Sequence, residues 1–186
     1  MSTSTPDLAA LAAKIQRLDD IEEIKRLRAA YFRCLDTANL AELETLLTPD
    51  FACLCIGGDY EYKADSKAEF LAMIESSFHQ EIVTQHNGHG PEIDLVDDTH
   101  ATGTVYFHDQ VYHFRSREFL MGTGIYRDRY RKVDGRWQIE YGVYERVYEL
   151  TEILPRAPHF TAHWLGKHGK KLPDDARYDS KTGRYG

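Results

Sequence analysis

The chain has 186 residues, of which 42% are hydrophobic, so it can bury a core of its own and is expected to form one main domain. Its 30 acidic and 23 basic residues give a formal net charge of -7, which argues against nucleic acid as a partner because phosphate binding depends on basic surface. No apolar run approaches the roughly 20 residues of a membrane-spanning helix. The polar N-terminus also lacks the order of a signal peptide, so we expect a cytoplasmic protein with no membrane partner.

The cysteine and histidine spacings do not predict a disulfide or a metal site. Cys34, Cys53 and Cys55 form an odd set with no C-x-x-C pair. His86 and His89 have the spacing H-x-x-H, but no third ligand with a clear geometry lies nearby. No glycine-rich phosphate loop or dinucleotide fingerprint occurs, so we also expect no cofactor.

Apolar residues recur at helical spacing from Leu8 to about Asp36, which predicts a long amphipathic helix. The acidic pair Asp19 and Asp20 is typical of the first turn of a helix, so we expect a break in the helix there and the start of a second one. The apolar positions are expected to form one stripe, made of Leu11, Ile15, Leu18, Ile21, Ile24, Leu27, Tyr31, Phe32 and Leu35.

The rest of the chain alternates short helices with strands and then becomes mostly strand. Asp134-Gly135 is a strong hairpin signal, and Asp65 or Ser66 is expected to cap a helix. The expected elements are, in chain order, a short helix capped by Asn39 and ended by Pro49, strands over 51–56 and 60–63, a helix over 67–78, and strands over 92–96, 101–114, 119–133 and 136–148. This order predicts an α+β fold in which N-terminal helices pack into a strongly curved antiparallel sheet with a concave mouth.

No repeat or low-complexity linker splits the chain into separate domains. We expect an N-terminal lead over residues 1–14, an α+β barrel domain over 15–150 and a C-terminal extension over 151–186. The extension lacks clear periodicity from Pro155 onward, so we expect it to pack across the body or against a neighbouring subunit.

Four segments resemble the SnoaL-like branch of the nuclear transport factor 2-like superfamily, and within it the bile-acid 7α-dehydratase and scytalone dehydratase-like group. The segments are Ile24 to Asp36 with the string YFRCLD, His86 to Ile93 with the string H-x-G-H, Ala101-Thr102-Gly103, and Asp134 to Arg146 with the string DGRW. The resemblance implies a cone-shaped α+β barrel, chemistry without a cofactor, and assembly into a homo-oligomer, with a trimer favoured over a dimer.

The resemblance also implies a set of catalytic residues. It places a pocket tyrosine at Tyr31, an Asp and His pair at Asp36 and His86, a further aspartate at Asp109, and an arginine at Arg146.

Asp36 and His86 are the residue types that a proton-abstracting pair requires. An imidazole titrates near neutral pH, and a carboxylate bound to one ring nitrogen leaves the other nitrogen facing substrate as a base. The alternatives are a hydrogen-bonding group at the helix end and a polar histidine at a strand entrance. His89 could also be the true partner of Asp36.

Tyr31, Asp109 and Arg146 each have a functional and a structural interpretation. Period two places Asp109 among apolar neighbours on one strand face, where a desolvated carboxyl group could protonate a leaving hydroxyl. Arg146 could hold a substrate carbonyl or carboxylate, or form a salt bridge with a neighbouring glutamate. Tyr31 lies about 140° from Asp36 on an ideal helix and could bind a substrate oxygen or belong to the core.

The resemblance, together with these residues, implies a cofactor-independent lyase that eliminates water or a similar group from a hydrophobic cyclic substrate, either steroid-like or of polyketide or aromatic type. The alternatives are a ketosteroid-isomerase-type isomerase and a non-catalytic binding module for a small hydrophobic molecule. Five further residues are expected to line the substrate pocket, namely His89, Phe107, Tyr112, Tyr126 and Tyr144.

Overall fold

The computed structural model describes residues 7–179, 184 and 185, and its longest helix is α1 (Leu8–Thr37). Asp7 caps the helix by accepting hydrogen bonds from two backbone N–H groups, and Ala38 ends it in the left-handed conformation. The predicted break at Asp19 and Asp20 is wrong because Asp20 begins no new helix. Its buried carboxylate accepts hydrogen bonds from Trp137 and Lys132 on the body of the protein.

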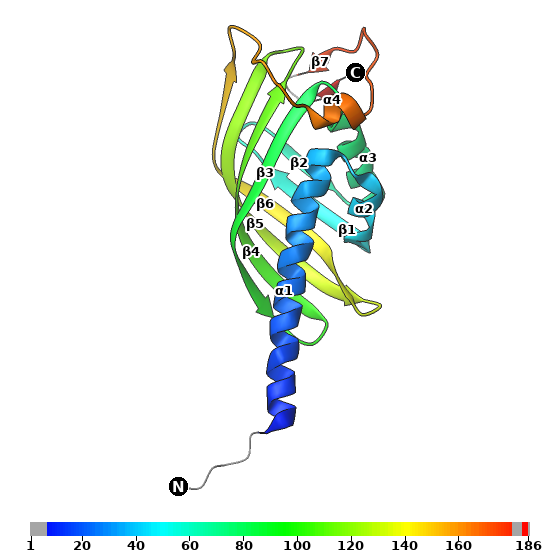
Figure 1. Ribbon diagram of the computed structural model, residues 1–186, viewed down its shortest axis with the longest axis vertical. Coiled ribbons are helices and arrows are strands. Elements are labelled where there is room, and N and C mark those ends of the chain that lie inside the picture. Colours follow the sequence, from blue (N-terminus) through cyan, green and yellow to red (C-terminus); the bar gives the residue numbers. More distant parts are fainter. Residues whose placement is uncertain (1–6, 180–183, 186) are drawn as a thin grey trace.

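The apolar residues of α1 form two stripes on opposite sides of the helix, not the single stripe predicted. The C-terminal half buries Ile24, Leu27 and Tyr31 in the core. The N-terminal half extends beyond the sheet (Figure 1) and exposes Leu8, Leu11, Ile15 and Leu18, each by half or more of its surface. Residues nine positions apart, such as Ile15 and Ile24, differ by about 180° around an α-helix, so the two stripes face opposite ways.

Two short helices and a hairpin follow α1. Asn39 caps α2 (Leu40–Thr45) as predicted, and Ser66 caps α3 (Lys67–Ser77). Between these helices, β1 (Leu47–Ile56) pairs with β2 (Glu61–Ala64). The short helix ends before Pro49, because the chain has already entered β1 at that position.

Four long strands complete a six-stranded curved sheet in the order β2-β1-β6-β5-β4-β3. They are β3 (Ile82–Leu95), β4 (His100–His113), β5 (Glu118–Val133) and β6 (Arg136–Ile153). The predicted α+β class is confirmed, but the sheet is not wholly antiparallel, because β1 and β6 run parallel. The sheet is open at β2 and β3, and the helices lie along one face of it (Figure 1).

The strand β3 begins ten residues earlier than the predicted strand at Glu92, so His86 lies inside an edge strand and not at its entrance. A register shift between His89 and Glu92, with Gly90 at a positive φ of 46°, interrupts its pairing with β4. This irregularity and the polar residues before it hide the apolar alternation that marks a strand.

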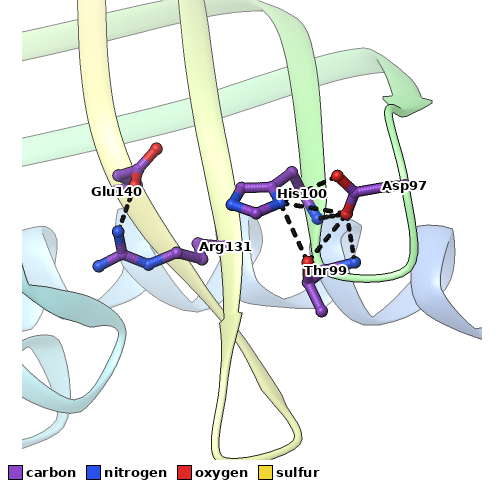
Figure 2. A network of polar contacts seen from close by, with 5 residues as sticks. All are labelled: Asp97, Thr99, His100, Arg131 and Glu140. Carbon is purple, nitrogen blue, oxygen red and sulfur yellow. Dashed lines mark hydrogen bonds and ion pairs between the residues drawn. The ribbon is translucent and has the colours of Figure 1, made fainter.

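Two tight turns set the strand register at one end of the sheet. Asp134 and Gly135 both have positive φ values, as the predicted β5–β6 hairpin turn requires. In the β3–β4 turn, Asp97 accepts hydrogen bonds from the backbone N–H groups of Thr99 and His100 (Figure 2). Together with the Thr99 hydroxyl and the His100 ring, which also contact the carboxylate, these bonds lower the pKa of Asp97 to about 2.

The C-terminal segment returns to the body of its own chain. It contains α4 (Trp164–His168), which buries Leu165, and a small hairpin of β7 (Tyr178–Asp179) and β8 (Arg184–Tyr185). The His163 Nε2 atom lies 3.0 Å from the carbonyl oxygen of Ile82 at the start of β3. Within the described part of the chain, no helix is both long and apolar enough to cross a membrane.

Candidate active site

Asp36 and His86 are in direct contact although 50 residues separate them. The last turn of α1 carries Asp36 to β3, where its Oδ1 lies 2.7 Å from His86 Nδ1. Its Oδ2 accepts a hydrogen bond from the backbone N–H of His86 at 2.9 Å. The Thr84 hydroxyl donates a third hydrogen bond to the carboxylate at 2.8 Å. The carboxylate is therefore fixed in position by β3 itself.

This hydrogen bonding determines the state of both groups. Burial alone raises the pKa of Asp36, but the bonds and charge of His86, with the Thr84 hydroxyl, outweigh burial and hold that pKa below its ordinary value. An ionised carboxylate only accepts hydrogen bonds, so the proton of a neutral His86 ring lies on Nδ1. The Nε2 atom is then unprotonated and can act as a base.

The His86 ring is held between aromatic side chains. It stacks on Phe32 with a centroid distance of 6.1 Å and an interplanar angle of 8°, and the Phe78 ring lies at 6.2 Å. Gly88 allows this close approach, because a Cβ at that position would lie 2.6 Å from the Phe32 ring. The His86 side chain is 10% exposed, so little of it meets solvent.

A cleft of about 680 Å³ lies between α1 and β3 and includes the Asp36–His86 pair in its wall. Its volume falls within the usual range for small-molecule sites, about 300–1,000 Å³. The main residues of the wall are Arg28, Phe32 and Asp36 from α1 and His86, His89 and Val105 from the sheet. Of the predicted site residues, only Asp36, His86 and His89 line this cleft.

Asp109 and Arg146 form a second polar pair, deeper in the sheet. Asp109 is the register partner of His86 across β3 and β4. Arg146 Nη1 and Nη2 donate hydrogen bonds to the two Asp109 oxygens at 2.5 and 2.8 Å, and Arg146 Nε lies 2.9 Å from Glu149. The charge of Asp109 raises the pKa of Arg146 although burial opposes the rise. Both oxygens of Asp109 thus bind a cation and are not offered to the cleft.

Four predicted aromatic residues fill the interior or pack elsewhere instead of lining the cleft. Phe107 and Tyr126 are buried with their ring centroids 4.7 Å apart. The Tyr144 hydroxyl lies 2.6 Å from that of Tyr60. Tyr112 packs against Phe160 of the C-terminal segment.

Tyr31 is also buried, and its ring lies parallel to that of Phe70. Burial raises the pKa of Tyr31 far above its ordinary value, so the phenol keeps its proton. It lies beside the cleft and not in its wall, as the 140° separation from Asp36 on α1 leads one to expect.

The sequence-based prediction missed Arg28, Phe32 and Thr84. Arg28 had a signal, because it is a charged residue placed among the buried positions Ile24, Leu27 and Tyr31. Thr84 had none, since its contact with Asp36 depends on the register of a strand that begins ten residues before the predicted one.

The fold is that of a cone-shaped α+β protein with a cleft beside its long helix, and the paired acid and histidine lie in the wall of that cleft. The model of the SnoaL-like domain matches residues 16–142, so the chain belongs to the SnoaL-like family. This confirms the family resemblance, with which the observed arrangement of helices and curved sheet agrees.

Solved structures with the same fold include enzymes of two named kinds. A hexachlorocyclohexane dehydrochlorinase, LinA Type2, matches with a TM-score of 0.66 and 17% identity over 80% of this chain and 97% of the other. A putative scytalone dehydratase from Novosphingobium aromaticivorans matches with a TM-score of 0.62 and 22% identity over 81% of this chain and 95% of the other. ActVI-ORFA from Streptomyces coelicolor matches with a TM-score of 0.56 and 18% identity over 68% of this chain and 96% of the other.

Proposed function

We propose that this protein is a cofactor-independent lyase that eliminates water, or a similar leaving group, from a hydrophobic cyclic substrate. The observation that carries the proposal is the 2.7 Å contact between Asp36 and His86 Nδ1 in the wall of the cleft. A carboxylate and an imidazole so arranged, each largely shielded from solvent, form a general base. The names of two structural neighbours, a dehydrochlorinase and a putative dehydratase, denote eliminations and support the same class.

In the proposed reaction, His86 Nε2 removes a proton from a carbon next to a substrate carbonyl. The electron pair of the broken C–H bond first gives an enolate, with the negative charge on the carbonyl oxygen. The enolate then collapses, so that the carbonyl re-forms, the new C=C bond forms and the C–O bond to the leaving hydroxyl breaks. The imidazolium then returns its proton to that hydroxyl, which departs as water. Asp36 stabilises the imidazolium and keeps Nε2 directed at the substrate.

Asp109 is expected from the sequence to protonate the leaving group, but its contacts favour another role. To act as a proton donor, Asp109 would have to give up its hydrogen bonds with Arg146. Both side chains are largely buried, so losing these bonds is costly. We therefore propose that Asp109 and Arg146 hold the part of the sheet behind His86 in place. The proton that the leaving group receives then comes from His86 itself.

The test is turnover of a panel of steroid-like and aromatic β-hydroxyketones, with loss of one water followed by mass spectrometry. His86→Ala should lower kcat by about 10²–10⁴ because the base is lost, while ligand affinity survives. His89→Ala is the matched control, since His89 lines the same cleft without contacting Asp36.

A binding module would bind members of the panel equally well before and after the His86 substitution and convert none. An isomerase using the same base would exchange the substrate proton with deuterated water without losing water. Turnover that persists in His86→Ala, or that disappears in His89→Ala alone, would contradict the assignment of the base.

A further inference from the structure

Arg28 is a buried cation in the wall of the cleft. Its residue is 3% exposed, and it lies on α1 eight positions before Asp36. The guanidinium carbon lies 3.6 Å from the centroid of Tyr126 and 4.4 Å from that of Tyr31. Aromatic faces stabilise the charge of a guanidinium but accept none of its N–H bonds in the way an oxygen does.

The ion pair of Arg28 leaves part of the guanidinium without hydrogen bonds. Its Nε lies 3.2 Å from Asp128, and both side chains are buried. Asp128 also accepts a hydrogen bond from Tyr130 at 2.7 Å. Among the described residues, neither Nε nor Nη2 of Arg28 makes a hydrogen bond of good geometry. The pair is thus neutral as a whole, while its donor groups are only partly used.

Such an arrangement lowers the stability of the folded protein if nothing binds to it. Burying a charged pair is costly unless its remaining donors find partners, and an apolar pair is often as stable. The same arrangement is well suited to an oxygen that gains negative charge during a reaction, because the donor is desolvated and belongs to the wall of the cleft that also holds the base.

We propose that Arg28 forms an oxygen-binding subsite of the cleft, which holds the carbonyl oxygen of the substrate as it becomes an enolate. The inference rests on the proposed function and adds the substrate class. The substrate is a cyclic ketone or a phenol-like ring system whose oxygen binds Arg28 while the adjacent C–H group faces His86. The subsite holds a single oxygen, because Asp128 already neutralises the charge of Arg28.

The test measures, by calorimetry at pH 8.5, the binding of two probes. One is 4-nitrophenolate, which resembles an enolate, and the other is nitrobenzene, which lacks the phenolate oxygen. The wild-type protein should prefer the phenolate by about tenfold or more, as expected for a charge-assisted hydrogen bond. Arg28→Met/Asp128→Asn removes both charges together and should abolish the preference. Arg33→Met is the control, because Glu42 binds both terminal nitrogens of Arg33.

Arg28→Lys gives a second test if the double variant fails to fold, since it keeps a cation beside Asp128 but not the planar donor group. It should lower the preference several-fold. No phenolate preference in the wild-type protein, or an unchanged preference in both Arg28 variants, would overturn the subsite. His86→Ala should keep the preference, so that failure of the proposed base is distinguished from failure of the subsite.

The exposed stripe of α1 carries a second, independent inference. Leu8, Leu11, Ile15 and Leu18 occupy alternating a and d positions of a heptad, each half or more exposed. Asp20 lies two residues past Leu18, on the opposite side of the helix, and it is bound to the body of its own chain. The seam therefore faces away from the molecule that carries it.

We infer that this seam pairs in parallel with the same seam of a second copy of the chain. Parallel pairing brings a g residue of one helix to the e residue of the next heptad on the other. Lys14 occupies the g position and Asp19 the following e position, so their charges are complementary across the pair. Ile15 at an a position and leucine at both d positions favour two helices over three.

The oligomeric state, measured by light scattering after size-exclusion chromatography, tests this pairing. The wild-type protein should contain the helix-paired dimer, and Leu11→Glu/Leu18→Glu should lose it, while Val96→Glu, a change at another exposed apolar residue, should not. Lys14→Glu should weaken dimerisation, and Lys14→Glu/Asp19→Lys should restore it. A monomeric wild-type protein, or an assembly that none of these helix changes affects, would overturn the inference.

Discussion

At the scale of single residues, the carboxylate of Asp36 joins the end of α1 to β3 through three hydrogen bonds. One of them comes from the backbone of His86 and one from its ring, so the position of the base and its tautomer depend on the same group. The YFRCLD string predicted Asp36, and the pattern H-x-G-H predicted His86. The hydrogen bond from Thr84 to Asp36 could not be predicted, because it depends on the position of β3 beside α1.

Two buried histidines outside the cleft should make stability depend on pH. Burial lowers the pKa of His79 and of His113 to about 4, from an ordinary value of 6.5. The unfolded chain binds more protons than the folded one between these values, so stability is complete above about pH 6.5 and falls as the pH drops toward 4. Each histidine accounts for up to about 3 kcal/mol.

Chemical denaturation at a series of pH values measures this effect. His113→Gln should flatten the dependence between pH 6.5 and 4, whereas His100→Gln, at an exposed position in the β3–β4 turn, should leave it unchanged. Equal slopes in the wild-type protein and in His113→Gln would contradict the assignment.

At the scale of elements, prediction from sequence succeeded where a local rule decides the structure. Asn39, Ser66 and the turn at Asp134-Gly135 act through their own backbone neighbours, and each lies where the sequence places it. The start of β3 and the parallel pairing of β1 with β6 depend on distant partners, which leave no local pattern. The single apolar stripe expected for α1 has a different cause, because the nine-residue spacing of Ile15 and Ile24 already places them on opposite sides of a helix.

The contact between β3 and α1 at Gly88 gives a prediction at this scale. Gly88→Ala would place a Cβ 2.6 Å from the Phe32 ring, which stacks on His86. The ring must move, so activity should fall by about tenfold or more with a modest loss of stability. Turnover assays and thermal unfolding measure the two effects.

A compensating change separates steric contact from other causes. Gly88→Ala should lower activity less in the Phe32→Leu variant than in the wild-type protein, because the ring that the new Cβ meets has been removed. Gly142→Ala is the control, since its Cβ would meet nothing closer than 3.4 Å. Additive losses in the double variant would show that the two residues act independently.

At the scale of the whole molecule, the family and the fold class followed from the sequence, but the position of the cleft did not. Phe107, Tyr126 and Tyr144 were expected to line the pocket, and the curved sheet packs them together in the interior. Periodicity shows which face of a strand turns inward. It does not show whether the inward side chains leave space between them, since that depends on how the helices pack over them.

The buried pair of Asp109 and Arg146 should contribute to global stability. Asp109→Asn leaves the Arg146 charge with Glu149 alone and should lower the free energy of unfolding by about 3 kcal/mol. Asp109→Asn/Arg146→Met/Glu149→Gln should recover much of that loss, because it leaves none of the three buried groups charged. The exposed pair of Arg127 and Glu145 provides the control, and Glu145→Gln should change stability by less than about 0.5 kcal/mol in urea denaturation.

The placement of His86 on an edge strand has a consequence for how the protein loses activity. Within the sheet, β3 is paired with β4 alone, so it can separate from β4 while the other strands stay paired. The base would then be lost by local opening under conditions in which most of the molecule is still folded. Amide hydrogen exchange should accordingly be faster in β3 than in β5, and binding of a ligand in the cleft should slow it at the edge first.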